Sequence, residues 1–161
     1  MLGYAGKFLE VDLSSGNIKE VRFSEEILRQ YMGGRALAVK ILWDRLGKRW
    51  ENIDPLGPEN LLLLLTGPLT GFAPGGRLCA SGKSPLSNGI VGSTVAGEFP
   101  IELRCAGYDG LIFTGKAERP VYLFIKDSDV EIKDASHVWG KDAKETLRVL
   151  VKEGRSELES R

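Results

Sequence analysis

The stretch TGPLTGFAPGGRLCASGKSPLSNGIVGSTVAGEFPIELRCAGYDG, residues 66–110, holds ten of the twenty glycines in this chain of 161 residues. Glycine reaches positive φ without steric cost and lets a ligand or another backbone come close. The stretch interleaves its glycines and prolines with strand-like and apolar segments, such as residues 77–80 and 99–103, which a disordered linker lacks. We therefore interpret residues 66–110 as an ordered scaffold that faces a ligand.

Arg77 directly follows Gly75 and Gly76 in this stretch. A guanidinium carries five N–H donors, and flanking glycines leave backbone N–H groups open, so the combination suits a phosphate or a polar heterocycle. The alternative is a tight hairpin with a surface arginine, and composition alone does not separate the two. A second Gly-Gly-Arg, at residues 33–35, stands in apolar helical surroundings, which favour a structural role over ligand contact.

Composition bounds the class of protein. The 22 Lys and Arg balance 22 Asp and Glu, so the formal net charge is zero, and nucleic acid is not expected as a partner. The longest aliphatic run, residues 61–65, is too short to cross a bilayer, and the N-terminus lacks a leader pattern, so we expect a cytoplasmic chain with no membrane partner. Cys79 and Cys105 lack the spacing of a zinc or iron–sulfur site, and we expect both to be buried free thiols.

The pattern of residues 1–66 predicts a hairpin, two helices and a buried strand. Strands over residues 7–13 and 17–23 precede a helix that begins at the N-cap Ser24 and stops near Gly33. A second helix is predicted over residues 35–46, and residues 61–66 read as a strand buried on both faces because the run does not alternate. The expected apolar face of the second helix is Ala36, Val39, Leu42, Trp43 and Leu46.

After the glycine-rich stretch, the pattern predicts short strands and a final helix. Residues 98–105 suggest a short helix, while residues 111–114 and 121–125 suggest neighbouring strands, followed by a strand over residues 130–133. Asp142 and Glu145 resemble a capping box that begins a helix reaching Glu153. Strands and helices without regular βαβ alternation favour an α+β fold with mixed or antiparallel sheets, in a single domain over residues 1–161.

The general catalytic motifs are weak in this sequence. His137 is the only histidine, and we interpret it as structural. Gly82-Lys83-Ser84 resembles the end of a P-loop, but Arg77 stands where the first glycine is required and proline follows Ser84, which argues against nucleoside triphosphate binding. The three tryptophans are interpreted as core or interface anchors. No catalytic residue is assigned from the sequence.

Several strings point to a known family. GPLTG (67–71), GGR (75–77), KSPL (83–86), ELRCAGYDG (102–110) and GKAERPVYLFIKD (115–127) resemble the N-terminal domain of tungsten-containing aldehyde ferredoxin oxidoreductases. GYAGKFLEVDLSSGNI (3–18), GGRALA (33–38), DPLGPEN (54–60) and DASHVWGKDAKET (134–146) fall in the same order as in that family. The resemblance covers about the whole chain.

The resemblance implies a base of two β-sheets that carries a tungsten or molybdenum bis-pterin cofactor (tungstopterin), with a magnesium ion bridging the pterin phosphates. Its Gly-Gly-Arg motif implies cofactor contacts by Gly75, Gly76 and Arg77. A following motif, usually Asn-Ser-Gly-Gly, falls on Thr94, Val95, Ala96 and Gly97, which implies cofactor contacts by Val95, Ala96 and Gly97 and magnesium binding by the Thr94 carbonyl. Thr94 replaces the usual Asn, and Ala96 adds a Cβ where the backbone is expected to approach the pterin.

The resemblance also implies an enzyme that oxidises aldehydes to carboxylic acids, passes electrons through a [4Fe–4S] cluster to ferredoxin, and forms a homo-oligomer. The family's C-x-x-C-x-x-x-C cluster motif is absent from these 161 residues, so we expect the chain alone to be inactive. It reads as an isolated or split portion of such an enzyme, or as a truncated reading frame. The alternative is a non-catalytic pterin-binding, assembly or interaction module.

Overall fold

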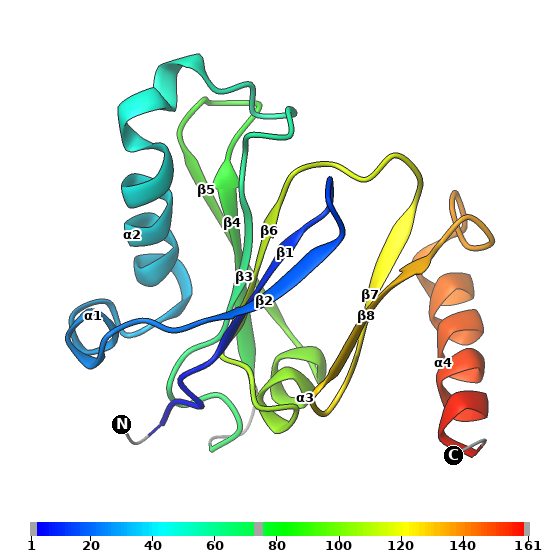
Figure 1. Ribbon diagram of the computed structural model, residues 1–161. Helices are drawn as coiled ribbons and strands as arrows, with labels where there is room; N and C mark the ends of the chain where they lie inside the picture. Colours follow the sequence, from blue (N-terminus) through cyan, green and yellow to red (C-terminus); the bar gives the residue numbers. More distant parts are fainter. Residues whose placement is uncertain (1–2, 73–75, 160–161) are drawn as a thin grey trace. The chain divides into compact units, whose positions relative to one another are not determined.

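The structure, a computed structural model, describes residues 3–72 and 76–159 (Figure 1). It combines helices with a mixed sheet, which confirms the predicted α+β class. The chain separates into two compact units, Met1–Ala117 with Ile125–Val130, and Glu118–Phe124 with Glu131–Arg161. The assignment of one domain to residues 1–161 stays a prediction.

The first unit contains a six-stranded sheet in the order β2-β1-β6-β3-β4-β5. β1 and β6 are parallel, and the other neighbouring pairs are antiparallel. The strands are β1 (Phe8–Asp12), β2 (Asn17–Val21), β3 (Leu62–Leu65), β4 (Arg77–Lys83), β5 (Ile90–Ala96) and β6 (Gly110–Thr114).

The prediction that residues 111–114 and 121–125 form neighbouring strands is wrong. β6 lies between β1 and β3, whereas β7 (Val121–Lys126) pairs with β8 (Asp129–Asp134) in a separate two-stranded sheet. Gly110, Leu111 and Ile112 are buried, so β6 occupies the interior of the large sheet and both of its edges are already paired. β5 was not predicted from the sequence: its residues, IVGSTVA, are largely exposed, and Gly92, Ser93 and Thr94 interrupt its apolar residues.

Two helices pack on this sheet. Ser24 caps α1 (Glu25–Tyr31) by accepting a hydrogen bond from the Ile27 N–H at 3.3 Å, which confirms the predicted cap. α2 (Gly34–Leu46) leads into the 3₁₀ helix η1 (Gly47–Asn52), and Figure 1 shows α2 beside the sheet. The core between them joins residues of α1, α2, β1, β3 and β6: Phe8, Leu28, Leu37, Ala38, Ile41, Leu42, Leu46, Leu63, Leu65 and Ile112.

The predicted apolar face of α2 is only partly correct. Leu42 and Leu46 are buried, but Ala36 is exposed, and Val39 and Trp43 are 39% and 71% exposed. Leu37, Ala38 and Ile41 are buried in their place. Apolar residues lie on more than one side of this helix, so helical spacing alone does not identify the side that meets the sheet.

β3 also differs from its prediction. Leu63 and Leu65 are completely buried, whereas Leu62 is 50% exposed, so burial alternates along a strand whose sequence does not. The reason is that the core with α2 takes one face of the strand and leaves the other less covered. The prediction that both cysteines are buried is half correct. Cys79 is buried, but Cys105, at the end of α3 (Phe99–Cys105), is exposed.

The second unit carries the final helix, α4 (Ala143–Glu159). The Asp142 carboxylate accepts a hydrogen bond from the Glu145 N–H at 2.8 Å, which confirms the predicted cap. The helix continues through Gly154, past its predicted end at Glu153, because a run of residues with good helix propensity follows the glycine. His137 Nε2 lies 2.9 Å from Glu153 Oε1, in keeping with a structural histidine.

The tryptophans differ in exposure. Trp139 is 74% exposed and, like Trp43, does not anchor a core in this chain. Trp50 packs partly buried against the core of the first unit. Among the described residues, no helix combines the length and the apolar character that crossing a membrane requires.

Candidate functional site

A cavity of about 810 Å³ opens in the first unit beside the start of α2. Its walls come from the Met32–Arg35 segment, from the turn after β3, from the start of β4 and from Thr94 of β5. The segments meet because β3 and β4 are adjacent antiparallel strands, while α2 begins against the end of β3. The cavity therefore lies between the start of α2 and part of the glycine-rich stretch that the sequence singled out.

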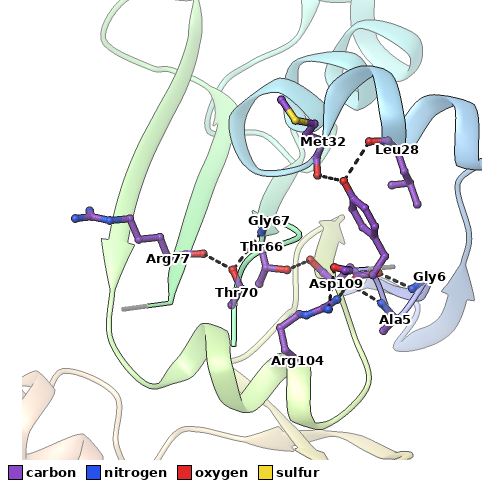
Figure 2. A network of polar contacts seen from close by, with 12 residues as sticks. Ala5, Gly6, Leu28, Met32, Thr66, Gly67, Thr70, Arg77, Arg104 and Asp109 are labelled. Atoms are coloured by element: carbon purple, nitrogen blue, oxygen red, sulfur yellow. Dashed lines mark hydrogen bonds and ion pairs between the residues drawn. The ribbon is translucent and has the colours of Figure 1, made fainter. Parts of the chain in front are cut away.

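Arg77 lines this cavity. Its side chain is exposed and makes no ion pair with another described residue, so neither Glu98 nor Glu102 neutralises it. Figure 2 shows the guanidinium pointing away from the polar network behind it, where Thr70 Oγ1 donates to the Arg77 carbonyl at 3.4 Å. Gly76 before it is buried, and a Cβ there would come within 2.7 Å of Ile101 Cγ1.

The β4–β5 register places the second predicted motif beside Arg77. Arg77 pairs with Ala96, Leu78 with Val95, and Cys79 with Thr94. Paired residues share a face of the sheet and side chains alternate along each strand, so Thr94 and Ala96 lie on the face of Arg77 and Val95 lies on the other. Thr94 lines the cavity.

The remaining predicted cofactor contacts lie around the cavity rather than in its lining. Of the described residues that line it, none is Gly76, Val95, Ala96 or Gly97. Gly97 follows β5 with a φ of +142°, a conformation that a larger side chain rarely adopts. Gly75 lies outside the described residues. The assignment of these residues to a cofactor stays a prediction.

Sequence reasoning gave less weight to the other Gly-Gly-Arg, and the structure brings it into the same cavity. Gly33 has a φ of +134°, and a Cβ there would come within 2.6 Å of the Thr66 carbonyl oxygen. The Gly34 N–H donates to that oxygen at 2.9 Å. Arg35 lines the cavity and donates from Nη2 to the Gly92 carbonyl at 2.8 Å. The repeated Gly-Gly-Arg pattern was the signal that could have identified it.

A buried polar network lies at the end of β3, next to residues that line the cavity (Figure 2). Thr66 donates to the Asp109 carbonyl from Oγ1 at 2.7 Å and from its main-chain N–H at 3.0 Å. The Asp109 carboxylate accepts from the N–H groups of Ala5 at 3.1 Å and Gly6 at 2.6 Å, and it forms an ion pair with Arg104. This network joins the N-terminal segment and α3 to the residue that meets Gly34.

Burial shifts two pKa values in this network. It lowers the pKa of Arg104 below its usual range, an effect that neighbouring Tyr4 and Cys105 partly oppose. It also raises the pKa of Tyr4 above 10.0, while the nearby Arg104 charge acts in the other direction. The Tyr4 hydroxyl lies 2.5 Å from the Met32 carbonyl oxygen and 3.2 Å from that of Leu28. A neutral phenol is therefore held against the end of α1.

The donor set of the cavity fits an anionic ligand. Arg35, Arg77, Thr70 and Thr94 line it beside a largely apolar wall, and none of the described lining residues is an aspartate or glutamate. Guanidinium groups pair well with phosphate. The described residues contain no group of three or more His, Cys, Asp or Glu that could hold a metal ion. The cavity thus suits the phosphate of an organic molecule better than a bare metal ion, and the phosphates of a pterin cofactor meet that requirement.

Comparison with known proteins gives matches over nearly the whole chain. Residues 8–160 match the family described as aldehyde ferredoxin oxidoreductase, N-terminal domain. An aliphatic sulfonate oxidoreductase, WOR-like subunit, of Pyrococcus furiosus is 52% identical over 98% of the chain and 25% of its own length. A tungsten-containing aldehyde ferredoxin oxidoreductase of the same organism is 45% identical over 98% of the chain and 26% of its own length.

A solved structure agrees with these relatives. The active site complex BamBC of benzoyl coenzyme A reductase, in complex with 1,5-dienoyl-CoA, superimposes with a TM-score of 0.88 at 39% identity, over 96% of this chain and 23% of that chain. The chain thus spans about a quarter of the length of the curated relatives it matches. The resemblance seen in the sequence is confirmed, and the chain belongs to the aldehyde ferredoxin oxidoreductase N-terminal domain family.

Proposed function

We propose that this chain is the cofactor-binding portion of an aldehyde:ferredoxin oxidoreductase and that the cavity beside Arg77 holds the phosphate-bearing part of a tungsten or molybdenum bis-pterin cofactor. The observation that supports this most directly is that Arg77 is exposed, lies on the same strand face as Thr94, and has no aspartate or glutamate among the described lining residues. Family membership and the tungsten named in several relatives support the choice of cofactor.

In this proposal, Arg77 donates charge-assisted hydrogen bonds to the cofactor, and Gly75 and Gly76 keep the approach to it open. The Thr94 carbonyl is an oxygen ligand of the kind that magnesium takes together with phosphate oxygens. Val95, Ala96 and Gly97 offer main-chain groups beside Arg77. When bound, the metal centre would supply the redox chemistry, while the residues of this chain bind and orient it.

The activity of the whole protein extends the proposal beyond this chain. We expect an enzyme that converts aldehydes to carboxylic acids, passes electrons through a [4Fe–4S] cluster to ferredoxin, forms a homo-oligomer and works in the cytoplasm. The chain alone is expected to be inactive. Because relatives include a sulfonate oxidoreductase subunit and a benzoyl coenzyme A reductase complex, the choice of substrate is expected to depend on residues outside the cavity described here.

Cofactor retention tests the proposal. The chain is produced within a protein or assembly that carries the full cofactor site, in a host that makes the pterin cofactor and is supplied with tungstate, and metal and pterin are measured after gel filtration. The wild-type chain is expected to retain both, and Arg77→Ala to weaken retention by roughly ten- to hundredfold, as loss of a charge-assisted hydrogen bond predicts. Arg148→Ala, an exposed arginine of α4, is the control. Equal cofactor content in wild type and Arg77→Ala, or none in either, would contradict the proposal.

A further inference from the structure

We propose that Arg35 is a second anion-binding residue of the cavity and that Arg35 and Arg77 together hold a ligand carrying phosphate groups, one guanidinium on each side of Thr94. This proposal rests on the proposed function in that both concern the same cavity. It assigns a role to a residue that sequence reasoning favoured as structural, and it names the ligand chemistry as phosphate.

Arg35 retains donors for a ligand. Its Nη2 donates to the Gly92 carbonyl at 2.8 Å, and a guanidinium has five N–H donors, so several remain for a second acceptor. The side chain is exposed and makes no ion pair with a carboxylate of another described residue. Its positive charge is therefore available at the cavity wall.

The structure also makes room for this arginine. A Cβ at Gly92 would lie 2.6 Å from Arg35 Nε and 3.2 Å from its Cδ and Cγ atoms. The side chain thus lies directly on the backbone of β5, where any residue larger than glycine would displace it. A guanidinium fixed in place before the ligand arrives loses less conformational entropy on binding.

Strand geometry places the two arginines along one line. Gly92, Thr94 and Ala96 are every second residue of β5, so their side chains lie on the same face of the sheet. Arg77 of β4 pairs with Ala96 and therefore lies on that face too. Gly92, which accepts the Arg35 hydrogen bond, and Ala96, the register partner of Arg77, are four residues apart, about 13 Å along the strand, with Thr94 midway. Both side chains are long enough to reach a phosphate group near Thr94 from opposite sides.

The helix start fixes the geometry of Arg35. Gly34 is tied to Thr66 by a 2.9 Å hydrogen bond, and Gly33 meets the same carbonyl so closely that a Cβ would not fit. Arg35 is the next residue, so its Cα is held at the cavity edge by backbone contacts that do not depend on a ligand. The close approach requires glycine at residue 33, and a φ of +50° favours glycine at residue 34.

Pyrophosphate titration tests the inference on the 161-residue chain. By calorimetry and by the rise in melting temperature, wild type is expected to bind inorganic pyrophosphate more tightly than orthophosphate. Arg35→Ala is expected to weaken pyrophosphate binding by roughly tenfold or more, and Arg35→Lys to restore part of the loss, because an ammonium keeps the charge without the planar fork. Gly92→Ala keeps the charge but displaces it, and is expected to weaken binding too. Arg148→Ala should bind as wild type does.

The outcomes separate this inference from the proposed function. Unchanged pyrophosphate affinity in Arg35→Ala, with or without a lower melting temperature, would overturn the inference and show that Arg35 only pins α2 to β5. If Arg77→Ala loses affinity while Arg35→Ala does not, the inference fails and the role of Arg77 stands. If wild type does not bind pyrophosphate at millimolar concentrations, the inference also fails, whereas cofactor retention decides the proposed function independently.

Discussion

The main-chain carbonyl of Asp109 accepts two hydrogen bonds from Thr66, one from Oγ1 at 2.7 Å and one from the N–H at 3.0 Å. Asp109 is 2% exposed, and its carboxylate binds the N-terminal segment and Arg104. One buried residue therefore connects the start of α2, through Thr66 and Gly34, to the N-terminal segment, 104 residues away in sequence at Ala5.

Replacing Asp109 should strongly destabilise the first unit. Asp109→Ala leaves the Arg104 guanidinium buried without its partner, and breaking one side of a buried ion pair costs about 3–5 kcal/mol. Urea unfolding measures the loss. Glu118→Ala, which removes an exposed carboxylate, is the control and should change the free energy of unfolding by less than about 0.5 kcal/mol. Equal stability of the two variants would show that the pair contributes little.

Gly33→Ala should be costlier than Gly6→Ala. Both glycines have positive φ, at +134° and +78°, so both substitutions strain the backbone. Only Gly33 would place its new Cβ against a backbone atom, the Thr66 oxygen at 2.6 Å, whereas nothing lies within 4 Å at Gly6. We expect about 1 kcal/mol for Gly6→Ala and more than about 2 kcal/mol for Gly33→Ala, measured by thermal unfolding. A smaller effect at Gly33 would contradict the close approach of α2 to Thr66.

Lys83 is a buried cation whose loss should loosen η1. Its Nζ donates to the carbonyls of Trp50 at 2.6 Å and Ile53 at 2.8 Å, and it lies 5.5 Å from the centre of the Trp50 ring. Lys83→Met leaves both carbonyls without this donor and should cost about 1.5–3 kcal/mol. Urea unfolding and the shift of tryptophan emission measure it. The exposed Lys48→Met serves as control and should leave both unchanged.

Glu10 should contribute a pH-dependent part of the stability. Burial raises the pKa of Glu10, but hydrogen bonds and charges from Arg45 at 2.6 Å and Lys19 at 3.3 Å outweigh it, so the folded-state pKa lies below 4.5. A lowered pKa means that this stabilisation is present above the unfolded-state pKa and is lost as the pH falls through the folded-state value.

The Glu10→Gln variant isolates that contribution. Wild type should exceed the variant by about 1 kcal/mol at most at pH 7, and the gap should close as the pH falls below 4.5. Urea midpoints over this pH range measure the difference. A gap that is independent of pH would show that packing, and not the charge of Glu10, carries the effect.

The open edge of β5 should promote self-association. β3 and β6 are each paired on both sides, whereas β5 is an edge strand of the six-stranded sheet, with Val95 52% exposed. An exposed apolar edge strand recruits another chain. Val95→Lys should reduce association in light scattering at micromolar concentrations, whereas Val151→Lys on α4, 44% exposed in wild type, should not. A monomeric wild type would contradict the prediction.

The sequence by itself determined features that depend on neighbouring residues. Ser24 and Asp142 each cap a helix by accepting a hydrogen bond from the N–H three residues ahead. In the β1–β2 turn, the Asp12 carboxylate accepts from the Ser14 N–H at 2.9 Å and from Ser15 Oγ at 2.7 Å. Such bonds form within a few residues, so local residue types predict them. The family could also be recognised from the sequence, because its characteristic segments occur in the same order along this chain and matching them requires no knowledge of packing.

The tertiary structure alone decided which faces are buried and which distant residues meet. Burial of Leu37 rather than Val39 follows from the side on which α2 meets the sheet, and the exposure of Leu62 follows from the limited cover of β3. Arg35 reaches Gly92 across 57 residues only because α2 begins against Thr66 beside the β4–β5 hairpin. Packing between elements depends on their shape and register, which hydrophobic periodicity does not specify. The sequence therefore identified Arg77 as a candidate, whereas only the fold showed that Arg35 lines the same cavity.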